Sequence, residues 1–187
     1  MLKKVLLMVV ALCLMTFSLA AQAAPRVAVL YANNAKTTYD DVLDDCVLKN
    51  LEKALSSRGY QFVKDDAALE SLKSMGMNDL GMAERRDIID AVKADDYNYI
   101  ICVTVEPMIR KEKFSMLTQG IEMTATVPFK MIDAKADRYL YNGKFVEKQG
   151  SSTPIGSVGN KSVALKALNK VNESINKVVA EKLAAAK

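Results

Sequence analysis

The sequence predicts an α/β (α+β) domain in which amphipathic helices pack on a mixed β-sheet, in the order β-α-β-α-α-β-β-β-α. Short, continuous apolar runs at residues 26–31 and 97–105 are typical of strands buried on both faces. Apolar side chains recur every third or fourth residue over 43–55 and 164–183, which is the pattern of helices with one buried side. Residues 122–146 predict two further strands joined by a turn.

The first half of the chain predicts two strand-helix pairs. Thr38 is expected to be the N-cap of the first helix, because Asp41 follows three residues later as a reciprocal capping partner. In order, the half holds a strand over 26–31, a loop over Asn33 to Lys36, a helix that ends at Gly59, a strand over 60–63 and a short helix around 67–72 that ends near Gly76.

The second half predicts a helix, three strands and a long final helix. Pro107 should end the strongest strand, because proline has no N–H to donate, and Pro128 implies an edge or a bulge in the next strand. In order, the half holds a helix over 82–94, strands over 97–105, 122–132 and 139–146 with a turn at 133–137, a mobile loop over Gly150 to Asn160 and a helix from Lys161.

The first 23 residues predict a cleaved signal peptide. Lys3 and Lys4 form a basic start, residues 5–20 are almost entirely apolar, and residues 21–23 form a small-x-small cleavage site. The apolar stretch is shorter than the roughly 20 residues that span a bilayer. We therefore expect a mature chain that begins at Ala24, works in the periplasm or outside the cell, and has no transmembrane span.

Residues 24–187 are predicted to form a single α/β domain. Lipidation at Cys13 is the less favoured alternative, because Leu12 before it is large. The mature chain would carry 24 basic and 22 acidic side chains, a balance that argues against nucleic acid as a partner.

The sequence contains no histidine. Histidine is the commonest general base, the usual partner of a nucleophilic Ser or Cys, and the commonest metal ligand. We therefore expect a protein that is not an enzyme and that has no cofactor and no metal. An enzyme that uses Asp or Lys is kept as a third alternative.

Two patterns resemble ligand sites without fitting them. The glycines around Lys161 lack the glycine that a phosphate-binding loop has before its lysine, because Asn160 stands there. Four acids, Asp40, Asp41, Asp44 and Asp45, fall in the first turns of a predicted helix, where they are favoured by the helix dipole without any metal. Asp40 and Asp44 share a face there and the other two diverge, which is a poor geometry for a metal ion.

Two cysteines remain in the mature chain, Cys46 and Cys102. They could form a disulfide in an oxidising compartment. We favour two buried free thiols, because both lie in apolar patterns and cysteine is among the most buried residue types.

Two segments are candidate ligand or partner contacts. The loop with Asn33, Asn34 and Lys36 follows the first strand, and open α/β sheets bind ligands at the carboxyl ends of their strands. The basic stretch after the strongest strand could meet an acidic partner, anionic lipid or a cell-wall polymer, although we favour its role in protecting a strand edge from other chains. That stretch contains Arg110, Lys111 and Lys113.

The order of these signals resembles a group of bacterial envelope domains. The resemblance is carried by the first strand, the long helix that ends at Gly59, the junction of residues 92–101, the hairpin at 129–141 and the final helix. These features are similar to the periplasmic domain of the curli secretion lipoprotein, to the amino-terminal domain of the Tol system's propeller protein, and to small exported bacterial proteins without a known activity. The resemblance implies a non-enzymatic domain for assembly or protein contacts.

We therefore expect an exported, soluble binding or assembly module of the bacterial envelope, with envelope proteins as partners. A homo-oligomer is left open. The alternative is a periplasmic protein that binds a small ligand or an ion.

Overall fold

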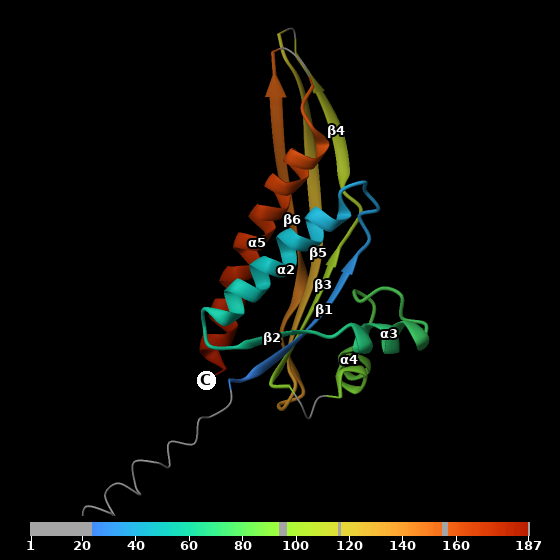
Figure 1. Ribbon diagram of the computed structural model, residues 1–187, viewed down its shortest axis with the longest axis vertical. Helices are drawn as coiled ribbons and strands as arrows, with labels where there is room; N and C mark the ends of the chain where they lie inside the picture. The colour runs from blue at the N-terminus through green and yellow to red at the C-terminus, as the bar shows by residue number, and fades with distance from the viewer. Residues whose placement is uncertain (1–23, 94–96, 116, 155–156, 187) are drawn as a thin grey trace, which may run out of the picture.

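The structure is a computed structural model that describes residues 24–93, 97–115, 117–154 and 157–186. The predicted signal peptide lies outside these residues. The described elements are β1 (Arg26–Asn33), α2 (Asp40–Ser56), β2 (Gln61–Lys64), α3 (Asp66–Ser74), α4 (Arg85–Val92), β3 (Tyr99–Val105), β4 (Ile109–Phe114), β5 (Gln119–Asp133), β6 (Arg138–Thr153) and α5 (Asn160–Ala185). The predicted fold class is confirmed: helices pack on both faces of a mixed, six-stranded sheet (Figure 1).

Strand β5 organises the sheet. The order is β2-β1-β3-β5-β4, with β6 on the other side of β5. β1 is parallel to β2 and β3, whereas β3, β4 and β6 all run antiparallel to β5. β3 pairs with residues 129–133 of β5 and β4 pairs with residues 119–124, so these two strands share one side of β5 at different heights.

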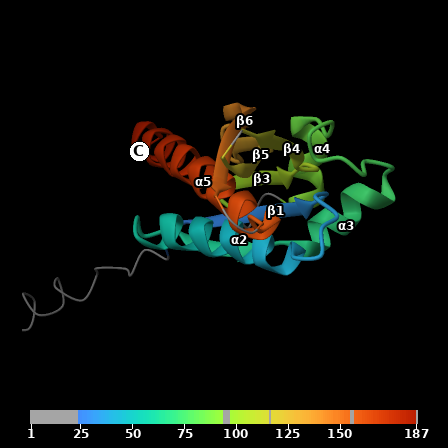
Figure 2. The same ribbon diagram turned by 90° about the horizontal axis from the view of Figure 1, so that it is seen from above.

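Alternate side chains of the central strands enter two separate cores. Odd-numbered residues of β1, β3 and β5, such as Val29 and Phe129, pack under α2 and α5. Even-numbered residues, such as Leu30 and Cys102, pack under α3 and α4. Figure 2 shows these two helix pairs on opposite faces of the sheet. This double burial explains why β1 and β3 are continuous apolar runs in the sequence.

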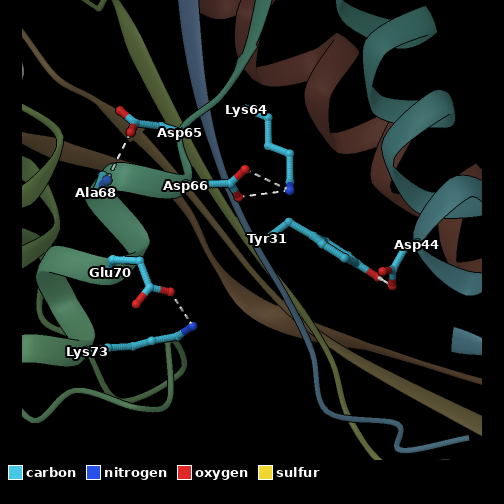
Figure 3. A network of polar contacts seen from close by, with 8 residues as sticks. All are labelled: Tyr31, Asp44, Lys64, Asp65, Asp66, Ala68, Glu70 and Lys73. Atoms are coloured by element: carbon cyan, nitrogen blue, oxygen red, sulfur yellow. Dashed lines mark hydrogen bonds and ion pairs between the residues drawn. The ribbon is translucent and has the colours of Figure 1, made fainter. Parts of the chain in front are cut away.

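The helix starts differ in part from the prediction. Tyr39, not Thr38, is the N-cap of α2, and it makes no side-chain capping bond. Asp40 instead accepts hydrogen bonds from the backbone N–H and the hydroxyl of Thr37, at 2.9 and 2.7 Å. Asp65 caps α3 by accepting from the Ala68 N–H at 2.9 Å (Figure 3).

Three strand assignments also differ from the prediction. β4 was not expected as a strand, because its residues are exposed and charged. Residues 150–153 belong to β6, not to a mobile loop. Pro128 is neither in an edge strand nor at the bulge, which lies between Met131 and Ile132. β3 pairs with residues 129–133 of β5 and β4 pairs with residues 119–124. Pro128 lies between these two stretches, so its missing N–H removes no hydrogen bond to either strand.

Asparagines join α2 to α5. The buried Asn172 donates to the Cys46 carbonyl at 3.0 Å. Asn50 and Asn176 exchange two amide hydrogen bonds of 3.0 and 2.9 Å. These directional bonds fix how the two helices are aligned on the sheet.

Candidate functional site

The loop after β1 is held by its own side chains. The Asn33 amide donates to Asp44 at 2.6 Å, and its oxygen accepts from the Ala35 N–H at 2.9 Å. The same Asp44 oxygen accepts the Tyr31 hydroxyl at 2.8 Å, a contact drawn in Figure 3. Burial and the bond to Asp44 raise the pKa of Tyr31. Asp44, one of the four clustered acids, is therefore engaged in structural bonds.

The other two residues of this loop have different environments. The Asn34 N–H donates to the Val105 carbonyl at 2.8 Å, which ties the loop to the end of β3. Lys36 has a backbone φ of 53°, in the left-handed region. A ligand contact by Asn33, Asn34 or Lys36 stays a prediction.

Both cysteines are free thiols. Cys46 is half-buried on α2 and Cys102 is buried on β3, in the core under α3 and α4. The two lie on opposite faces of the sheet, so they form no disulfide in this structure. Burial raises the pKa of Cys102 to about 12. Within the described ranges, no three His, Cys, Asp or Glu side chains are placed to hold a metal ion.

The structure separates the three basic residues predicted as a contact. Arg110 faces α5, where its Nε donates to Asn160 at 3.0 Å. Lys113 points to the opposite face, and its Nζ lies 2.6 Å from a Glu122 oxygen. Lys111 pairs with Glu122 in the β4–β5 register and shares the face of Lys113. Only the two lysines remain together.

The upper parts of β4, β5 and β6 form a three-stranded projection. Figure 1 shows these strands reaching beyond α2 and β1, with the start of α5 beside them. On the α5 side, Ile121 and Met123 are buried against Val163. β6 alternates between half-buried and exposed residues over 145–152, so its other side is open to solvent.

We call this uncovered side of the projection the open face. Lys113 donates to Glu122, and the charges of Lys148 and Lys111 lie close enough to lower the pKa of Glu122 further. The open face consists of Ile109, Lys111, Lys113, Glu122, Thr124, Thr126, Lys144, Val146 and Lys148. Thr124, on the central strand of this face, is only 7% exposed. Lys144, Val146 and Lys148 were not predicted as contacts, although their spacing of two residues along a strand places them on one face.

A cavity of about 690 Å³ adjoins the lower end of the open face. Lys130 lies in its wall and is 7% exposed. Its Nζ donates to the carbonyls of Leu80, Gly81 and Ala83 at 3.0, 2.8 and 2.7 Å. Burial lowers the pKa of Lys130. This lysine fastens the segment between α3 and α4 to β5, a role that the sequence did not indicate.

No protein-family model matches this chain, and no curated protein matches it. Solved structures do share its architecture. A protein from Helicobacter pylori, described as a homolog of the neuraminyllactose-binding hemagglutinin, is similar with 9% identity and a TM-score of 0.51, over 86% of this chain and 83% of that one. This likeness shows a common fold and nothing further.

Two more of the similar structures have lower scores. Lipoprotein GNA1162 from Neisseria meningitidis is 14% identical with a TM-score of 0.43, over 81% of this chain and 99% of that one. TolB from Acinetobacter baumannii is 12% identical with a TM-score of 0.40, over 86% of this chain and 28% of that one. Among the described residues, no helix is long and apolar enough to cross a membrane.

Proposed function

We propose that this chain is an exported, non-enzymatic binding or assembly module of the bacterial envelope, and that it contacts protein partners through its three-stranded projection. The open face carries this proposal. It is an extended sheet surface on which Ile109 is 56% exposed and Val146 is 47% exposed, among lysines. Apolar side chains with a polar rim are the composition of protein–protein contacts.

The cellular location is part of the same proposal. Residues 1–23 have the basic start, apolar stretch and small-residue site of a cleaved signal peptide, and residues 24–187 would then be the mature domain.

Cross-linking in cells tests the proposal. The full chain with a C-terminal tag is expressed, the cells are fractionated, and cross-linked products of the envelope fraction are identified by mass spectrometry. We expect an N-terminus at Ala24 and repeated capture of one envelope protein. Retention in the cytoplasm would overturn the export proposal, and capture of no protein other than this chain itself would overturn the role as a module for other proteins.

A second candidate function rests on the cavity beside Lys130. Its volume of about 690 Å³ is that of a small-molecule site, and the exposed Arg86 lines it beside Tyr139 and Asn142. Thermal-shift screening tests this function, because a ligand at about 100 times its Kd stabilises the folded state by roughly 2.7 kcal/mol. A panel of acidic and neutral metabolites that leaves the unfolding temperature unchanged would argue against it.

A further inference from the structure

We infer that the open face is the docking surface for an acidic amphipathic helix of a partner protein. This inference rests on the proposed function and specifies the chemistry of the partner. The surface is defined by four lysines around two exposed apolar residues, Lys111, Lys113, Lys144 and Lys148 with Ile109 and Val146.

The layers of the domain indicate a helix as the occupant. α5 covers the opposite face of the same strands, where Ile121 and Met123 are buried. α3 and α4 cover the lower part of the open side, over Cys102 and Ile132. The three strands of the projection are about 14 Å wide at a strand spacing of ~4.8 Å. One helix, with a diameter of roughly 10–12 Å, covers such a width.

The charges of the open face call for acidic side chains on that helix. Within the described part of the chain, Lys111, Lys144 and Lys148 form no ion pair, and Lys113 is paired with Glu122. Lys144 and Lys148 are four residues apart on β6, a separation of about 13 Å. Carboxylates about two turns apart on one side of a helix would match this spacing.

The apolar residues of the face lie between the lysines. Ile109 pairs with Thr124, and Thr126 pairs with Val146, so the two exposed apolar side chains stand on a diagonal across β5. A helix that lies along β5 would have Ile109 and Val146 on opposite sides of its apolar stripe, and its acids would point toward the lysines of β4 and β6. An amphipathic helix has this arrangement, with an apolar stripe on one side and charged residues next to the stripe.

The shape of the surface favours a helix over a membrane. The segment between α3 and α4 lies over the sheet beside the lower end of the open face, where its residues 81–84 and the first two residues of α4 share a cavity with Asn142 of β6. A flat bilayer cannot approach the sheet closely past this step. A single helix can lie beside it.

Site-specific photo-cross-linking in cells tests the inference. A benzoylphenylalanine replaces Val146 on the open face, and in a matched control it replaces Lys166, which is exposed on α5. We expect position 146 to link to a helical, acidic segment of an envelope protein, and position 166 to give much less of that product. The linked peptide is identified by mass spectrometry.

Charge reversal supplies the second measurement. The pair Lys144→Glu and Lys148→Glu is combined with the probe at position 146, and the pair Lys166→Glu and Lys170→Glu is the control, since these residues are exposed on α5. We expect the first pair to lower the yield of the linked product by at least about tenfold, and the control pair to leave it within about twofold. Equal far-UV circular dichroism of the variants shows that each is folded.

The outcomes separate the inference from the proposed function. If the tagged chain captures a partner but position 146 does not link to it, the inference and the contact through the open face are wrong, and only the role as an exported binding or assembly module stands. Links from position 146 to lipid, to a second copy of this chain or to a non-acidic segment also overturn the inference. If neither experiment captures another protein, both fail.

Discussion

The lower and upper halves of β5 belong to the same strand and have opposite roles. In the lower half, β3 and β6 flank the strand and both of its faces are buried, as Phe129 and Ile132 show at 0% exposure. In the upper half, β4 replaces β3, and only the α5 side remains apolar, with Ile121 and Met123. The other side changes to Glu122 and to threonines.

This difference shows how a domain acquires a surface for binding without disturbing its core. The buried alternation continues along most of the strand on one face, so α5 covers that face of the projection. On the other face the covering helices end, and polar or charged side chains begin. The ends of α3 and α4 therefore mark a boundary on this face of the sheet. The covered part below the boundary stabilises the fold, and the exposed part above it is available to a partner.

The largest expected effect is on the lower half. Phe129→Ala removes a fully buried ring that packs against Tyr141 and Phe145, with ring centroids 5.8 Å away in each case. We expect a loss of about 3–5 kcal/mol in the free energy of unfolding, measured with a chemical denaturant. The control Val146→Ala on the open face should change it by less than about 0.5 kcal/mol. Equal losses for the two variants would contradict the comparison.

The next effect concerns the fastening of α3 and α4. Lys130→Met removes the three hydrogen bonds from Nζ and leaves buried carbonyls without that donor. We expect a loss of about 2 kcal/mol, with faster hydrogen exchange at α3 and α4 than in β1. Lys144→Met, at an exposed position of the same face, is the matched control and should have little effect. An unchanged exchange pattern in the Lys130 variant would refute this role.

A smaller effect is confined to the upper half. Gly120→Ala adds a Cβ that would lie 2.7 Å from the Ser151 carbonyl oxygen, so β5 and β6 must separate there. We expect a cost of about 1–2 kcal/mol and faster exchange of residues 150–153, with β3 unaffected. Gly150→Ala is the control, because its nearest atom would be 3.5 Å away. Similar exchange in the two variants would count against a close approach at Gly120.

The smallest effect depends on pH. The hydrogen bond from Lys113 and the charges of Lys148 and Lys111 hold the pKa of Glu122 below its ordinary value of 4.5. The folded state therefore binds this proton less readily than the unfolded state, so its stabilisation is present above pH 4.5 and is lost as the pH falls through the folded pKa.

Glu122→Gln tests this sign. The variant should unfold at a slightly lower temperature than the parent at neutral pH, and the difference should disappear in acid. Added salt should also reduce it, because the carboxylate is near the surface. A difference that grows in acid would be the opposite of what this geometry requires.

The sequence predicted the buried elements and also β2 and most of β6, but it missed β4 and the end of β6. The double burial of β1 and β3 leaves continuous apolar runs, and α2 and α5 leave a regular helical spacing, so all four were found. β4 has no such apolar pattern in the sequence, because all six of its residues are exposed. The end of β6 was taken for a loop, since its glycine and serines fit a turn as well as an edge strand.

The candidate site was predicted only in part for a related reason. Lys111 and Lys113 stand in a conspicuous basic stretch. Lys144 and Lys148 are isolated in the sequence, and only the β5–β6 register brings them to the same face. Lys130 has the same residue type as these four and is buried, because its partners are backbone carbonyls about 50 residues earlier in the chain.

The contact between α2 and α5 determines when the domain can complete its folding. Cys46 and Asn172, which the hydrogen bond between these helices joins, are 126 residues apart, and α5 is the last of the described elements in the sequence. Such distant pairing makes folding slow, because a long loop must close before the contact forms. Until α5 docks, both sides of the projection are exposed, one with apolar residues and the other with lysines. The docking of α5 therefore determines which side of the projection stays exposed to a partner.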